Sequence, residues 1–84
     1  MPNALNIKCG DKLRIIGFKP DSARLYRTKL LAMGLTPGIE FRISRIAPLG
    51  DPIEIEIRGY MLSLRKNEVA VLKLEHVFTL HENT

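Results

Sequence analysis

The change of hydrophobic period at residues 33–38 constrains the fold more than any other feature of the sequence. Before Met33, apolar residues recur at steps of three and four, whereas after Gly38 they recur at every second residue. The first spacing is typical of one face of a helix, and the second of a half-buried strand. Between them, Gly34 suits a left-handed helix cap and Pro37 prevents the helix from resuming. The sequence therefore predicts a helix up to Met33 and a strand after Gly38.

The helix is expected to cover residues 23–33. Its inward face is predicted to consist of Ala23, Tyr26, Leu30 and Met33. Just before it, Asp21 and Ser22 each offer a short side-chain oxygen that can accept a hydrogen bond from the unpaired amides of a first helical turn. We therefore expect one of these two residues to be the N-cap.

Five segments alternate in the manner of strands. They cover residues 12–18, 39–44, 53–58, 60–64 and 69–74. Gly17 is expected to form a bulge, the turn-rich segment 48–52 to close a hairpin, and residues 65–68 to form a polar turn. The predicted class is mostly β: a small, strongly bent antiparallel barrel with one α-helix between the first and second strands.

The length of 84 residues fits one domain, 1–84, with a core at about 10–75 and a C-terminal tail at 76–84. Val77 and Phe78 are apolar enough to dock on the barrel. Cys9 is the single cysteine, so an internal disulfide is excluded and a reducing compartment is favoured. No apolar stretch approaches the ~20 residues that span a bilayer. These features predict a cytoplasmic protein.

Residues able to carry catalysis or hold a metal are few. One cysteine and two histidines provide little for a nucleophile or a general base, and we expect no enzymatic activity. A metal site would draw on Asp51, His76 and His81. Two histidines five positions apart on a strand point to opposite sides, so these residues favour weak binding of iron(II) or another divalent ion and no tightly bound cofactor.

The formal charge of +4 favours an anionic partner, but basic and acidic residues are interleaved along the chain. The five aromatic residues are expected mostly at core positions, which leaves no visible stacking platform for RNA. On the predicted helix, an apolar spot rimmed by positive charge is formed by Arg24, Leu25, Arg27 and Leu31. This set is our candidate for partner binding; alternatively, the two leucines extend the core.

Three segments carry a resemblance to a known family. They are RTKLLAMGLTPG at residues 27–38, APLGDP at 47–52 and RGYMLSLR at 58–65. Together they resemble the FeoA family, small cytoplasmic proteins of bacterial ferrous iron uptake, over about residues 13–74. The resemblance implies an SH3-like barrel. The motif residues themselves are expected to be structural: Met33, Gly34, Pro37, Gly38, Gly50 and Asp51.

The resemblance also implies an accessory function. Proteins of this family are thought to act with FeoB, a membrane permease with a cytoplasmic GTPase domain, to support or regulate iron(II) import. No helix-turn-helix pattern precedes the domain, so we expect no DNA binding. Two alternatives stay open, namely a metal-binding or metal-sensing domain and an RNA-binding small barrel. Self-association as a homo-oligomer also stays open.

Overall fold

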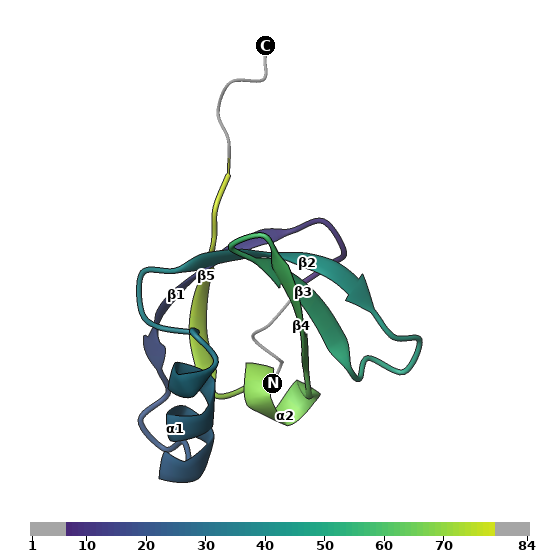
Figure 1. Ribbon diagram of the computed structural model, residues 1–84. Helices are drawn as coiled ribbons and strands as arrows, with labels where there is room; N and C mark the ends of the chain where they lie inside the picture. The colour runs from purple at the N-terminus through teal and green to yellow at the C-terminus, as the bar shows by residue number, and fades with distance from the viewer. Residues whose placement is uncertain (1–6, 79–84) are drawn as a thin grey trace.

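The computed structural model describes residues 7–78 (Figure 1). The elements in chain order are β1 (Lys12–Phe18), α1 (Arg24–Ala32), β2 (Glu40–Ile46), β3 (Ile53–Ile57), β4 (Tyr60–Leu64), α2 (Lys66–Val69) and β5 (Leu72–His76). The five strands form one antiparallel sheet in the order β4-β3-β2-β1-β5. The predicted class is confirmed, with one additional short helix before the last strand. No helix within residues 7–78 is long and apolar enough to cross a membrane.

The sheet bends strongly around its inner face, and α2 connects the two edge strands, β4 and β5 (Figure 1). Strand alternation places one apolar set inside, because successive side chains point to opposite faces. The largest fully buried side chains are Leu13, Ile15, Leu30, Leu35, Ile43, Ile55, Ile57, Leu64 and Leu72. The β2–β3 hairpin forms as expected, and the register of β1 against β5 shifts between Ile15 and Gly17. The predicted bulge at Gly17 is therefore confirmed.

The C-terminus of α1 is fixed by a Schellman motif. The amide of Gly34 donates to the carbonyl of Leu31, and the amide of Leu35 donates to that of Leu30, both at 3.0 Å. Gly34 has φ +94°, where a side chain would be strained, so the predicted cap is confirmed. Leu30 and Leu35 are both fully buried, which supplies the apolar contact that accompanies this motif.

The N-terminus of α1 differs from the prediction. The N-cap is Ala23, and neither Asp21 nor Ser22 caps the helix. The hydroxyl of Ser22 donates to the Lys19 carbonyl at 2.6 Å instead, because the tight turn after β1 brings that acceptor within reach. The predicted inward face is also only partly correct: Leu30 is buried and Met33 half-buried, but Ala23 and Tyr26 are exposed.

Helix α2 occupies the segment predicted as a polar turn, so that prediction was wrong. Glu68, 3% exposed, accepts a hydrogen bond from the Arg65 amide at 2.8 Å and another from the Lys29 ammonium of α1. These bonds satisfy a buried carboxylate and stabilise the first turn of α2. Val69 lies in this helix, and the last strand begins at Leu72.

Of the two residues expected to dock on the barrel at the end of the described chain, Val77 does so and Phe78 does not. The amide of Val77 donates to the Lys12 carbonyl at 2.9 Å, and its side chain is half-buried, which confirms that Val77 docks on the sheet. Phe78 is 77% exposed and does not dock. Its ring stacks on His76, with centroids 5.8 Å apart.

Candidate functional site

The outer face of α1, defined by Arg24, Leu25, Arg27 and Leu31, is the candidate site predicted from the sequence. Leu25 is 79% exposed and Leu31 is 44% exposed, so neither leucine extends the core. The helical period places Arg24, Arg27 and Leu31 along one side, with Leu25 further around the helix. Among residues 7–78, neither arginine lies within 4.0 Å of a carboxylate. The face therefore combines uncovered apolar surface with unpaired positive charge.

Contacts elsewhere on α1 hold this face outward. Leu30 anchors the helix in the core, and Lys29 forms an ion pair with the buried Glu68 of α2. The hydroxyl of Tyr60 in β4 donates to the Met33 carbonyl at 3.1 Å, at the end of the helix. Burial of the Glu68 carboxylate acts to raise its pKa, but the bonds from Lys29 and the Arg65 amide outweigh burial, and the pKa lies below its usual value.

In the described part of the chain, charged side chains on the strands form ion pairs with one another, unlike the two arginines on the outer face of α1. The Arg14 guanidinium in β1 bonds Glu40 of β2 at 2.9 Å and Glu75 of β5 at 2.5 Å, and it lowers the pKa of the Glu40 carboxyl. Lys12 lies 3.5 Å from the same Glu40. These groups neutralise one another across three strands, so they present little free charge to a partner.

The predicted motif residues occupy loops. The amide of Gly38 donates to the Ile15 carbonyl, and that of Gly50 to the Ala47 carbonyl, both at 2.7 Å. Pro37 is exposed at the turn between α1 and β2. The Asp51 carboxylate accepts from the Lys66 amide at 3.1 Å, which ties the β2–β3 loop to α2.

The candidate metal ligands do not meet in the part of the chain that the structure describes. Asp51 lies beside α2, whereas His76 lies in β5 and contacts Asp11 at 3.3 Å. Within residues 7–78, no group of three His, Cys, Asp or Glu side chains is placed to hold an ion. His81 lies outside the described residues. Weak metal binding therefore stays a prediction.

The aromatic side chains are more exposed than the sequence suggests. Phe41 is buried and Phe18 half-buried, but Tyr26, Tyr60 and Phe78 are exposed. The expectation that the aromatics mostly occupy core positions was wrong. The three exposed rings come from α1, β4 and the segment after β5.

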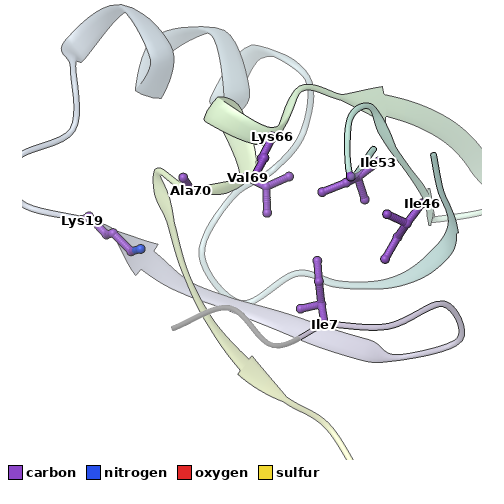
Figure 2. A pocket seen from close by; sticks show the side chains of 8 residues that line it. Ile7, Lys19, Ile46, Ile53, Lys66, Val69 and Ala70 are labelled. Carbon is purple, nitrogen blue, oxygen red and sulfur yellow. The ribbon is translucent and has the colours of Figure 1, made fainter. Parts of the chain in front are cut away.

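A pocket that sequence reasoning missed opens on another part of the molecule. It has a volume of about 240 Å³ and is lined by Ile7, Lys19, Ile46, Gly50, Ile53, Lys66, Val69 and Ala70. Figure 2 shows the branched side chains of Ile7, Ile46, Ile53 and Val69 pointing toward one another across the space. The lining comes from four separate segments, so no local sequence pattern reveals it.

Comparison with known proteins gives one family. The FeoA domain profile matches residues 5–76. A Pseudomonas aeruginosa protein solved by NMR is 42% identical, with a TM-score of 0.72 over 86% of this chain and 96% of that chain. A FeoA-like protein from Clostridium acetobutylicum is 37% identical, with a TM-score of 0.78 over 93% of this chain and 88% of that one.

A longer relative is the Fe(2+) transport protein A/Fe(2+) transporter FeoB fusion protein of Porphyromonas gingivalis. It is 30% identical over 66 residues, which are 79% of this chain and 8% of the fusion protein. The chain thus spans less than a tenth of that relative. The fold is the small SH3-like barrel of its structural neighbours. With a family profile that covers most of its length, the chain belongs to the FeoA family.

Proposed function

We propose that this chain is a non-enzymatic accessory protein of ferrous iron transport that docks on the cytoplasmic, GTPase-containing part of a FeoB-type transporter. One observation carries the proposal: the Porphyromonas gingivalis relative is a fusion protein in which a segment homologous to this chain is joined to FeoB in one polypeptide. Fusion keeps two modules at a high effective concentration, which is useful when they act in contact. For this chain, the same contact at the membrane would support or regulate iron(II) import.

The outer face of α1 is the surface proposed for this contact. Protein interfaces gain most of their affinity from a few apolar or arginine side chains that become desolvated at the centre of the contact. Leu25 and Leu31 supply exposed apolar surface, and the unpaired Arg27 supplies a donor for carboxylates of the partner. The Lys29–Glu68 ion pair and the Schellman motif hold the helix in place, which limits the entropy lost on binding.

The test is a titration of ¹⁵N-labelled protein, under anaerobic conditions, first with iron(II) alone and then with the purified cytoplasmic GTPase region of the transporter. We expect the GTPase region to shift amide signals of α1, and Leu31→Glu to weaken binding at least tenfold. Met61→Glu is the matched control, because Met61 is a similarly exposed apolar residue on β4. The control should bind within twofold of the wild type.

Two results would contradict the proposal. If Leu31→Glu folds normally and leaves both binding and iron uptake unchanged, the outer face of α1 is not the contact. If iron(II) alone shifts signals around Asp51 or His76 in a saturable way, the metal-binding alternative gains support instead.

A further inference from the structure

The pocket between the β2–β3 hairpin and α2 combines an apolar interior with a cationic rim. Ile53 and Val69 are buried core residues, while Ile7 and Ile46 are half-buried and pack against that core. The apolar wall is therefore continuous with the hydrophobic core. Lys66 lies on the α2 side, and Lys19 extends from the end of β1 toward the same space with its nitrogen leading (Figure 2).

Both lysines form backbone hydrogen bonds, but their side chains form no ion pair with the described residues. The Lys19 amide donates to the Val71 carbonyl at 2.9 Å, and the Lys19 carbonyl accepts from the Ser22 amide at 3.0 Å. The Lys66 amide donates to Asp51 at 3.1 Å. Among the described residues, neither ammonium lies within 4.0 Å of a carboxylate, Asp51 included. The rim thus carries two positive charges that no carboxylate of the described residues compensates.

The size of the pocket decides between kinds of occupant. Sites for whole small molecules usually measure about 300–1,000 Å³, and this one, at about 240 Å³, is smaller. One large apolar side chain fits such a space, as anchor residues do in protein interfaces. A free fatty acid brings a single carboxylate and would leave one of the two lysines unmatched. A peptide can place acidic groups on both sides of one apolar side chain.

We propose that this pocket binds an acidic, extended protein segment that inserts one apolar side chain and places a carboxylate two residues before it and another two residues after it. In an extended chain, residues at i−2, i and i+2 point to the same side, spaced roughly 6.6 Å apart. The apolar residue enters the pocket while its two neighbours on that side meet Lys19 and Lys66. This contact is separate from the outer face of α1, and it does not depend on the proposed function.

The experiment titrates the ¹⁵N-labelled full chain with three capped peptides and, separately, with octanoate. The probe is Glu-Ser-Leu-Ser-Glu, and the controls are Glu-Ser-Ser-Ser-Glu and Lys-Ser-Leu-Ser-Lys. We expect the probe to give saturable shifts centred on the amides of Gly50, Ile53, Val69 and Ala70. Each control should bind at least tenfold more weakly, and affinity for the probe should fall as salt rises because the rim contacts are ionic.

Variants separate the pocket from the charge of the whole protein. Lys19→Glu together with Lys66→Glu should reduce probe affinity at least tenfold, whereas Lys73→Glu, on the exposed face of β5, should leave it within twofold. Ala70→Leu should block the pocket and abolish binding without changing any charge. A dispersed amide spectrum confirms that each variant is folded.

Four results of the titrations would overturn the proposal. They are equal binding of the all-serine peptide, shifts scattered away from the pocket, unchanged affinity in folded Ala70→Leu, and octanoate binding tighter than the probe. Concentration-dependent shifts of the pocket amides without any peptide would also overturn it, since a second copy of the chain would then be the occupant.

Discussion

Of the two helices of this domain, the shorter one is the more buried and the longer one is the more exposed. Helix α1 has nine residues and buries Leu30 alone, whereas α2 has four residues and buries two of them, Glu68 and Val69. Helix α2 therefore belongs to the core structure, and α1 is a projecting element attached to it. The difference shows that burial, not helix length, decides which segment holds the fold and which is available to a partner.

The same contrast exists within α1 itself. Its C-terminal end is fixed by the Schellman motif, by Leu30 and Leu35 in the core, and by the Tyr60 hydroxyl. Its first turn has no side-chain cap, and Leu25 there is the more exposed of the two candidate leucines. The helix is thus anchored mainly at its C-terminal end, whereas the proposed docking face, from Arg24 to Leu31, runs along its whole length.

The largest effect is expected from the single anchor of α1. Leu30→Ala should lower the free energy of unfolding by about 3 kcal/mol, because it removes a fully buried side chain and leaves a cavity. Leu25→Ala, on the exposed face, should change it by no more than about 0.5 kcal/mol. Urea unfolding followed by circular dichroism measures both. Equal losses in the two variants would remove the distinction between the anchored and exposed faces.

A smaller effect is expected at the end of the helix. Gly34→Val should destabilise the fold by about 2 kcal/mol, because a branched residue is strained at φ +94°. An added Cβ would also lie 3.1 Å from the Tyr60 hydroxyl, a close contact that the ring would have to relieve. The thermal midpoint should fall accordingly. An unchanged midpoint would show that this cap contributes nothing to holding α1.

The smallest effect concerns the link between the helices, and it depends on pH. Glu68→Gln should cost about 1 kcal/mol at pH 7, because the amide loses the charged bond to Lys29 but keeps an acceptor for the Arg65 amide. The pKa of Glu68 is lowered from its ordinary value of 4.5 by folding. Its contribution is therefore complete above about pH 4.5 and is lost as the pH falls through the lower, folded-state pKa.

Unfolding curves at pH 7, 5, 4 and 3 test this linkage. The difference between wild type and Glu68→Gln should shrink below pH 4.5, while Asp11 and Glu40, whose pKa values are also lowered, give both proteins the same background slope. A difference that is constant with pH, or that grows in acid, would contradict the role of the charged carboxylate.

Sequence reasoning found the elements with strong periodic signals. Phe41 and Ile43 in β2, and the alternating isoleucines of β3, are buried as expected, and Gly34 with Pro37 marks the end of α1. Helix α2 was missed for physical reasons. Four residues are too few to show a helical period, and Arg65 is not a typical capping residue. Of the two bonds that hold Glu68, the one from Lys29 comes from a residue 39 positions away, which no local pattern contains.

For the candidate sites too, the sequence predicts what is local in the chain and misses what is assembled from distant segments. The outer face of α1 could be predicted because its residues lie within eight positions of one helix, where spacing alone defines a side. The pocket could not, since it is assembled from the segment before β1, the end of β1, the β2–β3 hairpin and α2. Asp51 was predicted as a turn residue or weak metal ligand, and its bond to the Lys66 amide appears only in the folded arrangement.

The pairing of β1 with β5 has a consequence for how the chain folds during synthesis. Leu13 faces His76 across these strands, so the partners are separated by most of the described chain. At a synthesis rate of about 5–20 residues per second, β1 waits about 3–12 s for β5 to be made. During that time one edge of β1 has no strand beside it, and the ion pair of Arg14 with Glu75 does not exist. Non-local closure of this kind is slow, and the nascent domain completes its sheet only at its final strand.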